Sequence, residues 1–193
     1  MSEQIVQPNK KLHIYRGIYF DSQEEIEFHM WLEEASTAGF VRFFNYKPEP
    51  FLLTDAQTVM IGDKKKHLIR KLIYTPDYYV VFSEQFSTTF EHGLFLAEHG
   101  QGTYIDVKGV PNVRQGANTS MVTFPIKQAW VYQKYGVYVN KVIARDMKLK
   151  GKVTKQGFFS KTFVPEQCAW MKARKTPTRM AAFANCRLLR EIV

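Results

Sequence analysis

The chain has 193 residues, of which 45% are hydrophobic and 15% aromatic, and this composition excludes a generally disordered protein. The formal net charge is +9, but residues 1–140 carry 14 Lys and Arg against 15 Asp and Glu, whereas residues 141–193 carry 13 against 3. A concentrated basic segment attracts polyanions, so nucleic acid is the expected partner. An anionic membrane, or a solvated tail that only aids solubility, are the alternatives.

The cysteines and the N-terminus limit the class of protein further. Cys168 and Cys186 are the only cysteines, and their spacing supports neither a disulfide framework nor a zinc ribbon. The first residues lack the apolar core of a signal peptide, and no stretch approaches the roughly 18 apolar residues that span a bilayer. We therefore expect a cytoplasmic protein without a membrane partner.

The first predicted element after a polar arm (residues 1–19) is a helix over residues 22–37. Ser22 and Glu25 form a capping box, and Gly39 supplies a C-terminal stop. Glu25 lies three and seven residues before two members of the apolar stripe, so its carboxylate should border the buried side. The predicted stripe is Phe28, Trp31, Leu32 and Ala35, with Glu24, Glu27, Glu33 and Glu34 on the other faces.

Two β segments are expected next. Residues 40–54 are aromatic but interrupted by two prolines, which is typical of an edge strand. After a turn-like, Lys-rich stretch around Gly62 and Asp63, residues 68–82 show the strongest β pattern in the chain. Pro76 removes a backbone donor in its middle, which predicts a bend where Asp77 lies.

The remaining pattern predicts alternating helices and strands. We expect a short helix with a glycine stop within residues 83–102, where two Glu-His-Gly triplets recur, then a strand ending at Gly109 and a loop over residues 110–122. A helix with Pro125 in its first turn and Gly136 past its end precedes a strand over residues 137–144. Residues 148–163 suggest a basic hairpin, and the segment from residue 165 has moderate helical character.

Four residues suggest a metal-dependent hydrolytic site: Glu25, Asp77, Asp106 and Lys108. Side chains two apart on a strand share a face, so Asp106 and Lys108 should lie together. Clustered carboxylates bind hard divalent ions such as Mg²⁺, which assist phosphodiester hydrolysis. We assign Asp77 and Asp106 as ligands, aided by the Val107 carbonyl, Glu25 to a second ion or its waters, and Lys108 to the attacking water or the transition state.

Each of these residues also has a purely structural interpretation. Glu25 could only complete the capping box, and Asp77 could be an ordinary turn residue after proline. Asp106 and Lys108 could form a surface charge pair at the end of a strand. Their combination on elements that one sheet-and-helix core would bring together favours an active site.

The segments FDSQEE, YTPDYYV and YIDVKG resemble the three signature motifs of the PD-(D/E)xK nuclease superfamily, and most closely those of the phage endonuclease I family of Holliday-junction resolvases. The resemblance spans roughly residues 20–110. It implies an α/β (α+β) fold with a restriction-endonuclease-like αβββαβ core, Mg²⁺ dependence with Mn²⁺ able to substitute, and a phage-encoded homodimer that nicks branched DNA. Asp106 stands where close relatives would have Glu, and 28 residues separate it from Asp77.

The expected organisation is an N-terminal arm (1–19), a nuclease core (20–145) and a basic C-terminal DNA-binding extension (146–193). The expected function is Mg²⁺-dependent cleavage of branched DNA. The alternatives are a nuclease of the same chemistry but other specificity (restriction-like, transposition-associated or single-strand-specific) and a non-catalytic DNA-binding module. The expected DNA-binding residues are Lys148, Lys150, Lys152, Lys155 and Lys161, with Phe158 or Phe159 available for packing or stacking.

Overall fold

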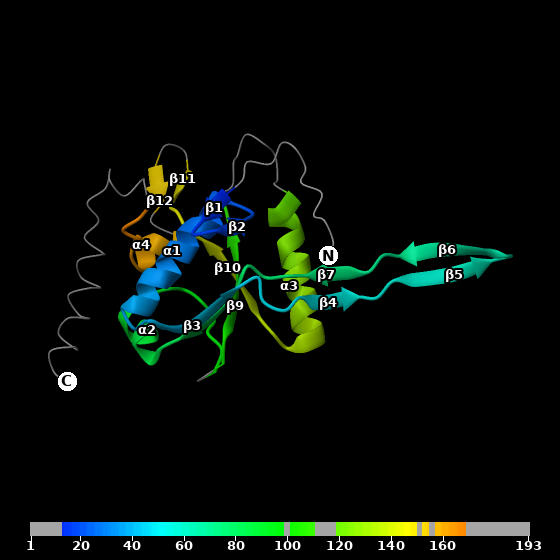
Figure 1. Cartoon of the computed structure of the whole chain (residues 1–193), viewed down its shortest axis with the longest axis horizontal. Coiled ribbons are helices and arrows are strands. Elements are labelled where there is room, and N and C mark those ends of the chain that lie inside the picture. The colour runs from blue at the N-terminus through cyan, green and yellow to red at the C-terminus, as the bar shows by residue number, and fades with distance from the viewer. Residues whose placement is uncertain (1–12, 99–100, 111–118, 150–151, 155–156, 169–193) are drawn as a thin grey trace.

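A computed structural model describes residues 13–98, 101–110, 119–149, 152–154 and 157–168. Its centre is a mixed four-stranded sheet in the order β10-β9-β8-β3, with only the β9–β10 pair parallel (Figure 1). The chain order of the sheet and its two main helices is α1, β3, β8, β9, α3, β10, as the sequence predicts. The bounds are α1 Gln23–Thr37, β3 Val41–Tyr46, β8 Tyr78–Phe82, β9 Thr103–Lys108, α3 Thr119–Tyr135 and β10 Val139–Ile143.

Helix α1 begins as its capping residues predict. The Ser22 hydroxyl accepts a hydrogen bond from the backbone N–H of Glu25 at 3.2 Å, and the Glu25 carboxylate accepts the N–H of Asp21 at 3.3 Å. All four members of the predicted stripe are fully buried. Glu27, however, was expected on an outer face and is buried, because the Arg145 guanidinium donates to it at 2.8 Å and neutralises its charge.

The two main helices lie on opposite faces of the sheet. Along β9, Ile105 and Val107 join the large core under α1, whereas Tyr104 packs on the smaller core that contains Phe124 and Val131 of α3. This alternation follows from the two-residue period of a strand. It places Asp106, between Ile105 and Val107, on the α3 face.

Helix α3 is longer than its sequence suggests. The pattern predicts Pro125 in the first turn and a loop over residues 110–122, but the helix begins at Thr119 and contains Pro125 in its interior. An interior proline removes one helical hydrogen bond. The helix nevertheless continues through Pro125 and buries Phe124 and Val131 against the sheet. The C-terminal end is as predicted, because Gly136 adopts a φ of +67° and donates to the Tyr132 carbonyl at 2.8 Å.

The connection between β3 and β8 forms a long antiparallel arm that extends away from the body (Figure 1). Residues 68–82 were expected to form one bent strand, but they divide between the end of β6, β7 and β8. The break at Pro76 and the turn at Gly62, which has a φ of +60°, are as predicted. Strand β4 (Phe51–Thr54) pairs with β7 (Leu72–Tyr74), and β5 (Gln57–Ile61) pairs with β6 (Lys64–Ile69).

The segment after β8 contains a shorter helix than expected. Helix α2 (Glu84–Thr89) has Phe90 as its C-cap, so it ends before the first Glu-His-Gly triplet and not at a glycine. His92 stacks on Phe86 at 4.5 Å and its Nδ1 accepts the N–H of Leu94 at 2.9 Å, so it is held by local packing. His99 lies outside the described residues.

Both ends of the described chain pack on the same body. Strands β1 (His13–Tyr15) and β2 (Ile18–Phe20) form a hairpin beside α1. Strands β11 (Met147–Leu149) and β12 (Lys152–Thr154) form a hairpin in the first half of the segment 148–163, where the sequence suggested one, and the second half contains a helix. Helix α4 (Phe158–Lys161) and the residues after it belong to the large core, which therefore continues past residue 145. Its members there are Phe158, Phe159, Phe163, Val164 and Cys168. No helix of the described part combines the length and the apolar character needed to cross a bilayer.

Candidate active site

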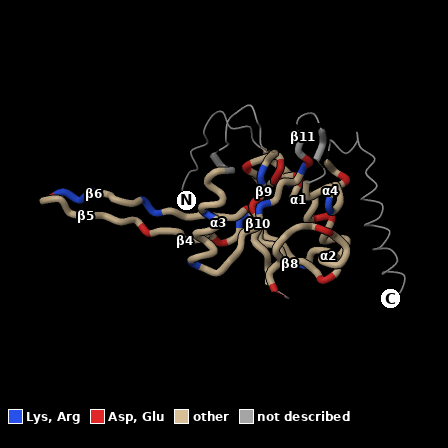
Figure 2. Tube along the Cα trace, turned by 180° about the vertical axis from the view of Figure 1, so that it is seen from behind, with Lys and Arg blue, Asp and Glu red and all other residues tan. Residues whose placement is uncertain are grey.

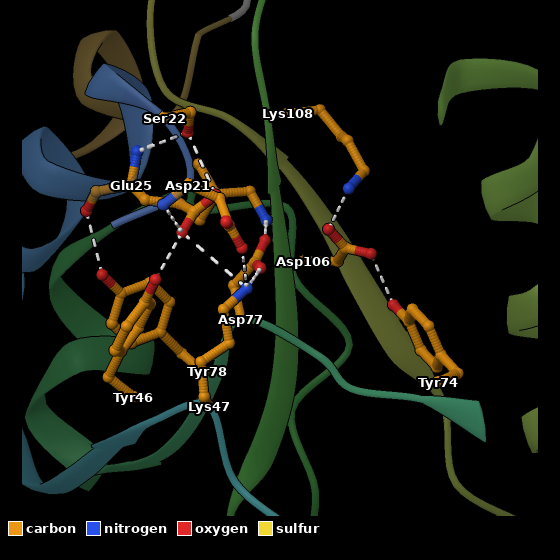
Figure 3. A network of polar contacts seen from close by, with 11 residues as sticks. Asp21, Ser22, Glu25, Tyr46, Lys47, Tyr74, Asp77, Tyr78, Asp106 and Lys108 are labelled. Carbon is orange, nitrogen blue, oxygen red and sulfur yellow. Dashed lines mark hydrogen bonds and ion pairs between the residues drawn. The ribbon is translucent and has the colours of Figure 1, made fainter. Parts of the chain in front are cut away.

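The predicted acids meet where β8 begins and β9 ends (Figure 3). Asp106 and Lys108 share the α3 face of β9, and the Lys108 ammonium pairs with the Asp106 carboxylate. Tyr74, at the end of β7, donates its hydroxyl to Asp106 Oδ2 at 2.5 Å. Only 3% of Asp106 is exposed, so its two partners hold a buried charge in one orientation.

Asp77 lies immediately before β8, at the level of the sheet itself. Its Oδ2 accepts the backbone N–H of Val107 at 2.7 Å, because the β8–β9 ladder stops at Ile105 and leaves this edge of β9 open. The N–H and C=O groups of one strand residue point to the same edge, so the Val107 carbonyl also faces this side. Asp77 and the main chain of Val107 are thus adjacent, as the expected ligand set requires.

Glu25 is joined to Asp77 through a lysine that the sequence did not single out. The Lys47 ammonium lies 2.6 Å from Asp77 Oδ1, 3.2 Å from Asp21 and 3.8 Å from Glu25 Oε2. Glu25 is 5% exposed and also accepts the Tyr46 hydroxyl at 2.8 Å. The structure therefore brings Asp77, Asp106 and Lys108 into direct proximity and connects Glu25 to them through Lys47.

Lys47 has an unusual backbone conformation. Its φ is +49°, in the left-handed region that side chains other than glycine rarely adopt. The Lys47 N–H donates to the Asp77 carbonyl at 2.8 Å, so main chain and ammonium both bind the same residue. A strained backbone conformation persists only where the surrounding contacts hold it in place. Residues with such conformations are common at functional sites.

A pocket of about 200 Å³ opens between the carboxylates and helix α3. Asp77, Asp106 and Lys108 form one wall, and Lys127 enters from α3 with its ammonium 5.6 Å from the centre of the Tyr74 ring. The pocket thus contains two carboxylates and two amines. The other residues that line it are Ile73, Tyr74, Thr75, Thr123 and Phe124.

The donor set suits a hard divalent cation. Asp77 and Asp106 are buried neighbours whose mutual repulsion a cation would relieve. Within the described residues, no three His, Cys, Asp or Glu side chains converge closely enough to hold a metal by themselves. A cation bound here would therefore take ligands from Asp77, Asp106 and the Val107 carbonyl, with waters completing its shell.

Burial and the charges of Asp106 and Glu25 raise the pKa of Asp77 from its usual 3.8 to about 8, against the opposite influence of Lys47. Between these pH values the folded state keeps a proton that the unfolded state has lost, so stability falls as pH rises. We predict that the free energy of unfolding in EDTA decreases from pH 5 to pH 8 more in the wild type than in Asp77→Asn. Urea titrations at both pH values measure this, and equal decreases in the two proteins would contradict it.

Three further residues belong to the site, and the sequence pattern did not indicate them. Burial alone would lower the pKa of Lys47, but the Asp77 and Glu25 carboxylates raise it above its usual value. Burial and the Asp106 carboxylate likewise raise the pKa of Tyr74, which therefore stays a hydrogen-bond donor. Lys127 is the third. The only available signal was that Lys47 follows an aromatic strand and precedes proline.

Only three of the five lysines expected to bind DNA lie among the described residues. Lys148 and Lys152 lie on the two strands of the β11–β12 hairpin, and Lys161 is exposed on α4. Lys150 and Lys155 lie outside the described residues. Phe158 and Phe159 are buried in the core, so packing and not base stacking is their role here.

Comparisons with models of protein families, with curated proteins and with solved structures return no match.

Proposed function

We propose that the protein is a Mg²⁺-dependent endonuclease that hydrolyses phosphodiester bonds in DNA. The observation that carries this proposal is the pocket in which two buried carboxylates, Asp77 and Asp106, face two amines, Lys108 and Lys127. Carboxylates bind a metal ion and amines bind a phosphate, so a metal-dependent phosphodiesterase can use both kinds of group within one site. The order of the core elements and the three sequence motifs agree with a restriction-endonuclease-like core, which forms part of the proposal.

In this proposal Asp77, Asp106 and the Val107 carbonyl hold the cation, with Glu25 on its waters or on a second ion. Bound Mg²⁺, or Mn²⁺ in its place, would supply positive charge against the charge that grows on the phosphate. Tyr74 keeps Asp106 oriented through its hydrogen bond. Lys47 offsets the repulsion among the carboxylates from the α1 side.

The two amines of the pocket would act on the substrate. Lys108 is placed beside Asp106 and can bind a phosphate oxygen or orient the attacking water. Lys127 reaches into the same space from α3, so the scissile phosphate would lie between the sheet and this helix. Removal of either amine should therefore weaken phosphate binding as well as slow cleavage.

The motif resemblance supports branched DNA as the substrate. A two-fold homodimer would present two such sites to the paired strands of a four-way junction. The test is Mg²⁺-dependent cleavage of a synthetic four-way junction compared with linear duplex of the same sequence. We predict at least tenfold faster cutting of the junction, an excess of about 1.4 kcal/mol in transition-state stabilisation. Equal or faster cutting of the linear duplex would contradict the junction preference and leave a nuclease of other specificity.

A non-catalytic DNA-binding module is the second candidate, and one observation favours it. The Lys47 ammonium already lies among three carboxylates, a position in which a resident cation could replace the metal. This candidate predicts salt-sensitive DNA binding without cleavage in Mg²⁺ or Mn²⁺.

A further inference from the structure

The arm formed by β5 and β6 stands apart from the body of the protein (Figures 1 and 2). All eleven residues of the two strands are exposed, and the two strands form a sheet of their own. A two-stranded hairpin is at best marginally stable alone in water. Its length and isolation therefore indicate a structure that is completed by a binding partner.

The side chains of the arm combine apolar and basic character. Five apolar residues are exposed on it, and three of them have about 60% of their surface open to solvent: Met60, Ile61 and Leu68. Val59 and Ile69 are the other two. Single exposed apolar residues are ordinary, but this many on one ribbon mark an interaction surface.

The charge of the arm identifies the chemistry of the partner. Residues 55–71 contain five Lys and Arg and two Asp, whereas the rest of the first 140 residues contains 9 basic and 13 acidic residues. Figure 2 shows this positive charge at the tip of the ribbon and at its base. A polyanion is therefore the complementary partner.

The register distributes the tip lysines over both faces. Lys64 pairs with Ile61 and Lys66 with Val59 on one face, while Lys65 pairs with Met60 on the other. A ribbon that is basic on both faces suits a groove with a phosphate backbone along each wall. The major groove of duplex DNA, about 12 Å wide, admits a two-stranded β-ribbon.

The same lysines argue against a second copy of the chain as the partner. Lysine is depleted in the buried parts of protein interfaces, and lysine on an edge strand hinders pairing with another strand. The exposed apolar side chains would instead contact sugars and base edges within the groove.

We propose that the β5–β6 arm binds duplex DNA, with Lys64, Lys65 and Lys66 on phosphates. The proposal rests on the proposed function only in taking DNA as the polyanion, and its test needs no cleavage. The full chain carrying Lys64→Gln, Lys65→Gln and Lys66→Gln is titrated with a labelled duplex in EDTA over a range of salt concentrations. The matched control removes the same charge from exposed residues of the body: Arg42→Gln, Lys134→Gln and Lys141→Gln.

We expect the arm variant to bind at least tenfold more weakly than the wild type, with a salt slope of log K smaller by about 2.7. The control should lose less than threefold, and both variants should keep the circular dichroism spectrum of the wild type. Equal losses in the two variants, or none in the arm variant, would overturn the proposal. A change from dimer to monomer in sedimentation without a specific loss of DNA affinity would also overturn it, and would assign the arm to self-association.

Failure of the proposed function is distinguishable from failure of this proposal. Weak duplex binding by the arm variant of a protein that never cuts DNA would support the arm and remove the nuclease. Normal binding by the arm variant of a protein that does cut DNA would remove the arm and keep the nuclease.

Discussion

Replacing Asp106 with Asn is expected to slow the single-turnover cleavage of DNA on the order of 1,000-fold, a loss of about 4 kcal/mol in transition-state stabilisation. The substitution keeps the size of the side chain, but it removes one of the two negative charges that would hold the cation. Asp77→Asn should have a similar effect. The measurement is the cleavage rate of a labelled junction at saturating protein, with Mg²⁺ in excess.

A measurement of DNA binding distinguishes a loss of catalysis from a loss of the folded structure. In EDTA both variants should bind DNA at least as tightly as the wild type. Asp106→Asn removes one negative charge near the phosphates, and Asp77→Asn resembles the neutral form that Asp77 already has below pH 8. Glu91→Gln is the matched control, since it removes one charge from an exposed residue outside the pocket. Wild-type cleavage by Asp106→Asn, or an equal loss in Glu91→Gln, would refute the assignment of the site.

The second large effect is expected at Lys47. In the Lys47→Met variant the aliphatic stem remains, but the Asp77 and Glu25 carboxylates lose their shared ammonium. An uncompensated buried charge destabilises a protein strongly, and because Lys47 is partly exposed we expect a loss of about 2 kcal/mol in EDTA above pH 8, where Asp77 is ionised. Thermal and urea unfolding measure it.

The effect of Mg²⁺ on stability distinguishes a role of Lys47 at the metal site from a general contribution to stability. If Mg²⁺ binds among the same carboxylates, it should stabilise Lys47→Met more than the wild type, because it replaces the missing positive charge. Lys141→Met, at an exposed position of β10, should change stability by less than about 0.5 kcal/mol and should respond to Mg²⁺ as the wild type does. Equal Mg²⁺ responses in all three proteins would contradict the binding of Mg²⁺ among these carboxylates.

The parts of the fold that the sequence predicts well are those that pack on the core. Helix α1 has a capping residue, Ser22, and a stripe that is buried without exception, so its period is clear. Strand β9 alternates between two covered faces and places Asp106 beside Lys108. In both elements burial selects the residue pattern from which the prediction is made.

The arm could not be predicted in the same way. Both of its strands are exposed on every side, so no buried face imposes a two-residue alternation, and Lys64–Lys66 resemble a loop. Only the turn at Gly62 carries a local signal, because its φ is positive. The start of α3 could not be predicted for a different reason. Proline favours the first turn of a helix, whereas Pro125 lies in the interior of α3.

In the candidate site, too, some residues could be predicted from the sequence and others could not. Asp77, Asp106 and Lys108 follow from motif spacing and strand alternation, which are local properties of the chain. Lys47 reaches the carboxylates through a left-handed backbone and a contact with a residue thirty positions away. No short-range pattern encodes such a contact.

The most direct test of the central claim is the location of a divalent cation in crystals grown with Mn²⁺, by its anomalous scattering. We predict one peak within about 2.5 Å of carboxylate oxygens of both Asp77 and Asp106. A fully ordered site with no peak there, or with Mn²⁺ bound only elsewhere on the molecule, would contradict it.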